Sequence, residues 1–180
     1  QEVTTVEQGK IVMGYRTYVP YGSDDFFALI LCAGVLGMFP HSKLFTNVRE
    51  KQSLCYSVYS SLLKSNGLMM IQAGINPGDY GKALAGIEKE VEKMRAGDFT
   101  ADEIKKSYLA LENHYKTDLD SPSGVIHTHH DWQAYGLDYD YDSVLRKLKA
   151  VTATDIRAAA RKIKLDTVYF LTAGKAKSKK

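Results

Sequence analysis

Cysteine and proline are scarce in this chain, which has two cysteines and four prolines among its 180 residues. Cys32 and Cys55 are too few for a disulfide framework or a cysteine-rich zinc cluster. Both lie in apolar stretches, so we expect buried free thiols in a reducing compartment, and a bacterial cytoplasm fits best. The longest apolar run, residues 26–38, is shorter than a bilayer span and contains two glycines, so we expect no membrane helix.

The sequence motifs of several common enzyme classes are also absent. There is no GxxxxGK(S/T) phosphate loop, no GxGxxG, no GxSxG and no CxxC pair. None of the five histidines has a glutamate at the HExxH or HxxEH spacing of a zinc-binding helix. These absences argue against a P-loop nucleotidase, a serine hydrolase of the GxSxG type and a self-contained zinc peptidase.

An excess of charge of one sign is confined to the C-terminus. The formal net charge is +3, and four positive charges come from Lys175, Lys177, Lys179 and Lys180. We therefore predict one domain, residues 1–174, followed by a solvated, disordered basic tail, residues 175–180. No nucleic-acid or membrane partner is expected. The start shows no signal-peptide pattern and no initiator methionine, which suggests a mature fragment or an isolated domain.

The composition, 44% hydrophobic and 25% charged, is typical of a soluble globular domain. Periodicity and turn residues predict strands at residues 10–19, 54–63, 67–75 and 165–172. Helices are predicted at residues 24–36, 42–51, 79–96, 100–118, 124–135, 142–149 and 152–163. The Asn66-Gly67 pair indicates a hairpin between the middle strands. The expected fold is α+β, with an antiparallel-rich sheet and helices packed on one face.

One histidine cluster resembles a metal site. On a helix, His127 and His130 lie three residues apart and His127 and Asp131 four apart, so these side chains share a face. Imidazole and carboxylate groups could hold a divalent metal there, although a zinc site normally needs further ligands. The alternative, which we favour, is a polar helix face with Trp132 packing on the opposite side.

The segment from Ser42 to Ser60 carries the most information. It predicts a short helix that ends in a charged turn and enters a strand. Arg49 lies at the C-terminal end of this helix, where a cation is favoured by the helix dipole. Tyr56 is predicted on the strand, on the same face as Leu54 and Val58. Taken alone, Arg49 is expected to pair with a carboxylate and Tyr56 to be an ordinary strand residue.

This segment resembles the hallmark of the second half of pitrilysin/insulinase-like zinc metallopeptidases, S-x-L-F-x-x-(V/L)-R-E-K-x-x-L-x-Y-S-V-x-S. The chain matches that pattern at Ser42, Leu44, Phe45, Val48, Arg49, Glu50, Lys51, Leu54, Tyr56, Ser57, Val58 and Ser60. Upstream, Leu36-Gly37 stands where the family usually has a Leu-Gly-Gly turn, and Met38 departs from it. The later helices also resemble the family, so the resemblance covers most of the chain.

The resemblance implies half of a two-part enzyme. In this family two homologous halves enclose a chamber, and one half carries a histidine-x-x-glutamate-histidine zinc motif. The other half contributes an arginine and a tyrosine seven residues apart, a spacing that Arg49 and Tyr56 match. The resemblance thus implies that Tyr56 donates to the scissile carbonyl, while Arg49 holds the substrate backbone or orients Tyr56. It places no cofactor in this chain and expects zinc in a homologous partner half.

Three functions therefore stay open. The first is the zinc-free half of a zinc-dependent metalloendopeptidase that acts on a peptide substrate and is inactive alone. Its zinc-bearing half would belong to the same polypeptide or to a separate subunit. The second is a non-catalytic scaffold or processing partner on the same fold. The third is an independent metal-binding protein that uses His127, His130 and Asp131.

Overall fold

The computed structural model describes residues 2–4 and 8–173, so the predicted basic tail lies outside the described residues. The strands form one sheet in the order β1-β5-β2-β4-β3. Their bounds are β1 Glu2–Thr4, β2 Gly9–Arg16, β3 Ser57–Leu63, β4 Leu68–Ile75 and β5 Lys164–Ala173. β1 pairs parallel with β5, and every other pairing is antiparallel. This confirms the antiparallel-rich sheet.

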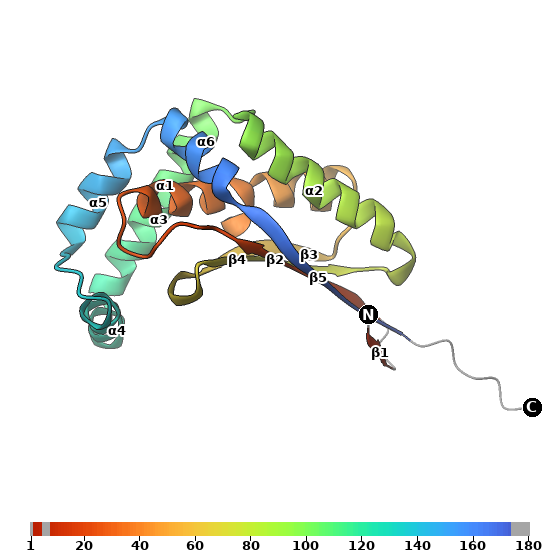
Figure 1. Cartoon of the computed structure of the whole chain (residues 1–180), viewed down its shortest axis with the longest axis horizontal. Coiled ribbons are helices and arrows are strands. Elements are labelled where there is room, and N and C mark those ends of the chain that lie inside the picture. Colours follow the sequence, from red (N-terminus) through yellow and green to blue (C-terminus); the bar gives the residue numbers. More distant parts are fainter. Residues whose placement is uncertain (1, 5–7, 174–180) are drawn as a thin grey trace, which may run out of the picture.

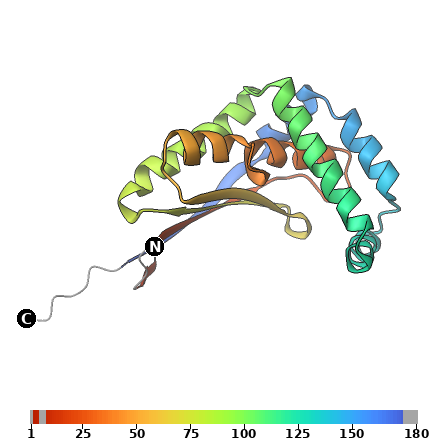
Figure 2. The same ribbon diagram turned by 180° about the vertical axis from the view of Figure 1, so that it is seen from behind.

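The helices pack on one face of this sheet, as predicted (Figure 1). They are α1 Asp25–Ala33, α2 Tyr80–Ala96, α3 Ala101–Leu119, α4 Pro122–Ala134, α5 Tyr141–Ala150 and α6 Ala153–Lys162. Two segments are π-helical, η1 Gly34–Met38 and η2 Leu44–Lys51, and two are short 3₁₀ turns, η3 Lys64–Asn66 and η4 Pro77–Asp79. Viewed from behind, the opposite face of the sheet carries none of these described helices (Figure 2).

Local side-chain signals define the ends of several helices. Thr100 and Glu103 form the predicted capping box of α3, in which each side chain bonds the other residue's backbone N–H. α2 ends at Gly97, whose φ of +84° is the left-handed conformation that glycine adopts without strain. The hairpin predicted at Asn66-Gly67 joins β3 to β4 through η3, with Gly67 at φ +60°.

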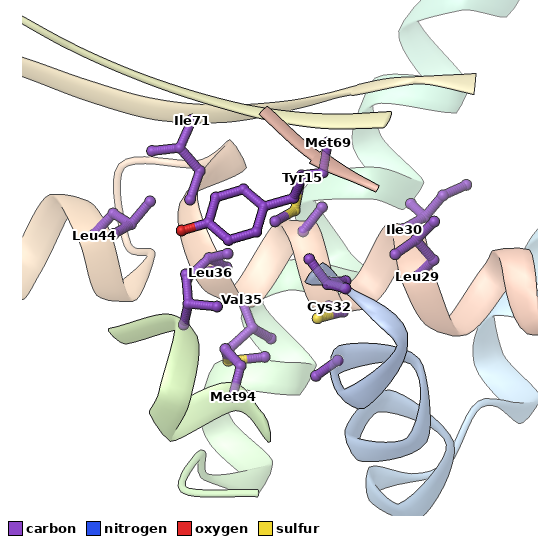
Figure 3. Close-up of a cluster of buried hydrophobic side chains, with 14 of the residues drawn as sticks. Tyr15, Leu29, Ile30, Cys32, Val35, Leu36, Leu44, Met69, Ile71 and Met94 are labelled. Carbon is purple, nitrogen blue, oxygen red and sulfur yellow. The ribbon is translucent and has the colours of Figure 1, made fainter. Parts of the chain in front are cut away.

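The core lies between the sheet and the helices. Side chains alternate along β2, so that Ile11, Met13 and Tyr15 point inward and are at most 2% exposed. Figure 3 shows Tyr15 directed from the sheet toward the helical layer, where it meets apolar side chains from several elements. Cys32 lies in this cluster and Cys55 is also buried, and both are free thiols, as expected. Burying such side chains is the main force that holds the two layers together.

Two predicted elements differ from the structure in their bounds or type, and one strand was not predicted. The helix predicted at residues 24–36 changes at Gly34 into the π-helical η1. The strand predicted from Leu54 begins only at Ser57, because the backbone N–H of Leu54 bonds the Val48 carbonyl at 3.1 Å instead of a strand. β1 was missed because three residues are too few to show a hydrophobic alternation.

Candidate functional site

The candidate site is built where η1, η2 and β3 meet, and Gly37 sets how closely they approach. A Cβ atom added at Gly37 would lie 2.7 Å from Leu44 Cδ1 and 3.0 Å from the backbone nitrogen of Ser60. Only glycine therefore fits between η2 and β3 at this point. The Ser60 hydroxyl also donates to the Ala33 carbonyl at 3.1 Å, which ties β3 to the end of α1.

The π-helical η2 carries Arg49 on an anchored scaffold. Its inward side chains, Leu44 and Val48, are fully buried. Arg49 and Lys51 occupy its last turn, where cations interact favourably with the exposed carbonyl groups. π-helical turns are rare and frequently mark functional sites.

The chain then reverses before it enters β3. Ser53 adopts a φ of +53°, which is uncommon for a residue with a side chain. Three residues later, the backbone N–H of Tyr56 donates to the Gly74 carbonyl of β4 at 2.8 Å. Tyr56 is therefore attached to the sheet by its backbone, one residue before β3 begins.

Arg49 meets Tyr56 through the peptide group. Arg49 Nε donates to the Tyr56 carbonyl oxygen at 2.9 Å, and the guanidinium carbon lies 4.4 Å from the centre of the Phe45 ring. The ion pair with a carboxylate, expected for Arg49 from the local pattern alone, was wrong, since no ion pair among the described residues includes it. The structure thus brings together the two residues that the sequence singled out.

The Tyr56 side chain is directed outward. It is 62% exposed, whereas Val58 is buried, so the prediction that the two share one face was wrong. The reversal at Ser53 and the bend at Tyr56 break the alternation before β3 begins. Tyr56 also borders a cavity of about 240 Å³ together with Asn76 and Asp79. Its hydroxyl has no hydrogen bond within the described part of the chain, so it is available to an external acceptor.

The neighbouring Cys55 is not suited to act as a nucleophile. Its side chain is buried, and this burial raises the pKa of the thiol to about 11. The thiolate is the reactive form of cysteine, and it is scarce at neutral pH when the pKa is so high.

The sequence did not reveal the polar residues of α2 and α3 that pair with residues in and next to η2. Glu90 of α2 is 1% exposed and accepts a hydrogen bond from Asn47 of η2 at 2.9 Å. Lys43, which precedes η2, is 8% exposed and pairs with Glu103 of α3 at 2.9 Å. One available signal was Glu90 itself, a charged residue on the apolar stripe of α2 between Ile87 and Met94.

The histidine cluster on α4 is organised differently from a metal centre. Asp131 accepts hydrogen bonds from the Tyr21 hydroxyl at 2.8 Å and from Lys64 at 3.3 Å. Burial, together with this bond to Asp131, raises the pKa of Tyr21. Trp132 is buried, as the favoured interpretation expected, and the His129 ring packs edge-on against it. Within residues 2–4 and 8–173, no group of three or more His, Cys, Asp or Glu side chains is arranged to hold a metal ion.

A larger cavity, of about 580 Å³, lies beside this cluster between β3, α3 and α4. His127 and Asp131 line it, together with Leu111 and Trp132. His130 is not among the lining residues, so the three side chains of the metal-binding hypothesis do not converge there.

Over the described residues, no helix is both long and apolar enough to cross a membrane.

Comparison with known proteins identifies relatives along most of the chain. The family described as Peptidase M16 inactive domain matches residues 1–111. A Bacillus subtilis protein named "Probable inactive metalloprotease YmfF" is 36% identical over 166 residues, which cover 92% of this chain and 39% of that protein. A Streptomyces coelicolor protein named "Uncharacterized zinc protease SCO5738" is 30% identical over 160 residues, covering 87% of this chain and 35% of that protein.

Solved structures agree in fold. A conserved protein from Enterococcus faecalis superposes with a TM-score of 0.91 at 31% identity, over 96% of this chain and 41% of that chain. The peptidase M16 inactive domain from Pseudomonas fluorescens superposes with a TM-score of 0.82 at 18% identity, over 99% of this chain and 44% of that chain. The chain spans less than half the length of these relatives. It belongs to the M16 peptidase family, the pitrilysin/insulinase-like zinc proteases, and corresponds to the family's inactive domain.

Proposed function

We propose that this chain is the zinc-free half of a zinc-dependent metalloendopeptidase, in which Arg49 and Tyr56 contact the peptide substrate. The observation that carries the proposal is the hydrogen bond from Arg49 Nε to the Tyr56 carbonyl, 2.9 Å long. It holds the backbone of Tyr56 while the side chain stays 62% exposed. A donor on a rigid backbone is the arrangement that transition-state contacts require.

The described residues of this chain do not fit a zinc ion. The sequence has neither HExxH nor HxxEH, and the described residues hold no cluster of three or more suitable side chains. We therefore place the zinc in a homologous half, in the same polypeptide or in a separate subunit. The short coverage of the relatives, 39% of the Bacillus subtilis protein, supports a larger assembly.

Each of the two residues has a distinct role in this proposal. The Tyr56 hydroxyl donates a hydrogen bond to the carbonyl oxygen of the scissile peptide bond, and a single donor of this kind is typically worth about 3 kcal/mol. Arg49 orients Tyr56 through its Nε, and the terminal nitrogens of its guanidinium bind the substrate backbone. The guanidinium stays charged at every relevant pH.

The decisive experiment removes the phenolic oxygen of Tyr56. In the assembly reconstituted with the zinc-bearing half, Tyr56→Phe is expected to lower kcat by roughly a hundredfold, because one hydrogen-bond donor is lost. Association of the halves should not change, since the Tyr56 backbone makes the contacts that hold the site together. The matched control is Tyr59→Phe in β3, a 45% exposed tyrosine outside the site, which should leave kcat unchanged. Full activity of Tyr56→Phe would refute the donor role.

A non-catalytic scaffold or processing partner is the second candidate, and the name of the Bacillus subtilis relative as an inactive metalloprotease favours it. In that case the two halves associate normally and Tyr56→Phe has no effect on any turnover. The free buried thiols and the bacterial relatives support a bacterial cytoplasm as the location in either case.

A further inference from the structure

A buried carboxylate on α2 joins the helix that carries Arg49. Glu90 is 1% exposed, and both of its carboxylate oxygens are used. Oε2 accepts from Asn47 Nδ2 at 2.9 Å, and Oε1 accepts from Lys93 Nζ at 2.8 Å. Asn47 belongs to η2, two residues before Arg49. The contact therefore links α2 to the middle of η2, next to the last turn that carries Arg49.

The Asn47 side chain is held from both ends. Its amide nitrogen donates to Glu90, while its amide oxygen accepts from Lys51 Nζ at 3.1 Å. Its backbone carbonyl accepts from Gln52 Nε2 at 2.9 Å. Asn47 thus connects the buried carboxylate, the end of η2 and the turn that leads to Tyr56.

α2 packs directly against η2 beside this link. Gly86, one helical turn before Glu90, lies against η2, and a Cβ atom built there would be 3.6 Å from both Val48 and Leu54. A buried carboxylate is costly to desolvate, and apolar residues often replace such groups without loss of stability. Glu90 is therefore better explained by the geometry it imposes on Asn47 than by a contribution to stability.

We propose that Glu90 and Asn47 are positioning residues that hold the last turn of η2, so that Arg49 Nε reaches the Tyr56 carbonyl. They act through Arg49 and touch no substrate. The consequence for turnover rests on the proposed function of Arg49 and Tyr56, but the effect on the Arg49 hydrogen bond does not.

The test measures the Arg49 Nε–H proton by NMR in the whole chain. When this proton is hydrogen-bonded to the Tyr56 carbonyl, its exchange with water is slowed. Glu90→Leu removes both acceptor oxygens and should speed the exchange by about tenfold, since one hydrogen bond corresponds to a factor of this size. Glu90→Gln keeps an oxygen for Asn47, while the 31% exposed Lys93 can turn to solvent. This conservative variant should restore slow exchange.

The matched control lies on the same helix. Arg95 of α2 donates to the Ile163 carbonyl at 2.5 Å, and none of its side-chain hydrogen bonds or ion pairs within the described residues involves η2. Arg95→Leu should lower the melting temperature and leave the exchange of Arg49 Nε–H unchanged. If Glu90→Leu does not fold, Asn47→Ala removes the same link from the other side and should give the same tenfold effect.

Unchanged Arg49 exchange in a folded Glu90→Leu or Asn47→Ala chain would overturn the positioning role. So would equal acceleration in Arg95→Leu, because it would show a general loosening of the fold. In the reconstituted assembly, Glu90→Leu should lower kcat more than it raises KM, and Glu90→Gln should recover it. If Tyr56→Phe is fully active while Glu90→Leu speeds the exchange, the proposed function fails and the positioning role stands.

Discussion

At the scale of single residues, the site depends on the absence of a side chain at Gly37 and on the peptide group of Tyr56. Gly37 has no side chain, and this lets Leu44 and Ser60 approach from η2 and β3. Tyr56 is held by its peptide group, which leaves the phenol ring free for an external partner. At both positions the backbone maintains the fold. At position 56 the side chain therefore remains available to bind an external group.

We expect Gly37→Ala to destabilise the chain by roughly 1–3 kcal/mol, the usual cost of overpacking a core. The added methyl group would meet the backbone nitrogen of Ser60 at 3.0 Å, and a backbone atom cannot turn aside. The control is Gly81→Ala in α2, where nothing lies within 4 Å of the added atom. This second variant should be neutral or stabilising, since alanine favours helix. Urea unfolding checks both, and a neutral Gly37→Ala would contradict the close approach.

At the scale of elements, η2 is fastened to two different helices. Asn47 connects it to α2 through Glu90, and Lys43 connects its start to α3 through Glu103. Glu103 also forms the capping box with Thr100, so the beginning of α3 and the beginning of η2 share one carboxylate. A change in the ionisation of Glu103 therefore affects both elements together.

Stability should fall in acid as Glu103 is protonated. Burial by itself raises the pKa of Glu103, but hydrogen bonds from Thr100 and the ion pair with Lys43 outweigh it, and the folded pKa is lowered. The contribution to stability is then complete above the unfolded pKa of about 4.3 and is lost as pH falls through the folded pKa. Lys43→Met should raise the pKa of Glu103 and move acid unfolding to higher pH.

An NMR titration of the Glu103 carboxyl, with urea unfolding at each pH, measures both quantities. Lys106→Met is the control, because Lys106 pairs with Asp102 on the exposed side of the same helix at 2.7 Å. It should leave the Glu103 titration nearly unchanged. A Glu103 pKa that is insensitive to Lys43→Met would show that the ion pair has no energetic role.

The sequence predicts an element best when the contacts that decide its ends are local. The capping box of Thr100 and Glu103 lies within one helical turn, and α3 began where it was predicted. No glycine marks the reversal of the chain at Ser53. The predicted strand therefore began too early, and Tyr56 was assigned to the wrong face. The pairing of Asn47 with Glu90 joins residues 43 positions apart, and only the folded chain reveals it.

At the scale of the whole molecule, the described helices lie on one side of the sheet (Figures 1 and 2). β3 is the last strand in the sheet order, and Tyr56 stands directly before it. The candidate site therefore lies at the margin of the sheet, where a second body can approach. This placement agrees with the partner half that we propose.

Zinc binding by the chain alone is the simplest test at this scale. Calorimetric titration with zinc is expected to show no tight stoichiometric site, because Asp131 already accepts bonds from Tyr21 and Lys64. A variant carrying both His127→Ala and His130→Ala should give the same weak heats. A stoichiometric site that disappears in this variant would restore the independent metal-binding hypothesis.

The bond between Arg49 and the Tyr56 carbonyl has one further consequence, because a main-chain oxygen is the same in every amino acid. The architecture around position 56 therefore does not depend on the phenol group, provided that the residue there keeps the N–H that donates to Gly74. A variant that loses the phenolic oxygen would therefore keep the backbone and the shape of this region. Under the proposed function, catalytic and purely structural versions of such a domain would then differ by a single atom, and neither would be harder to fold than the other.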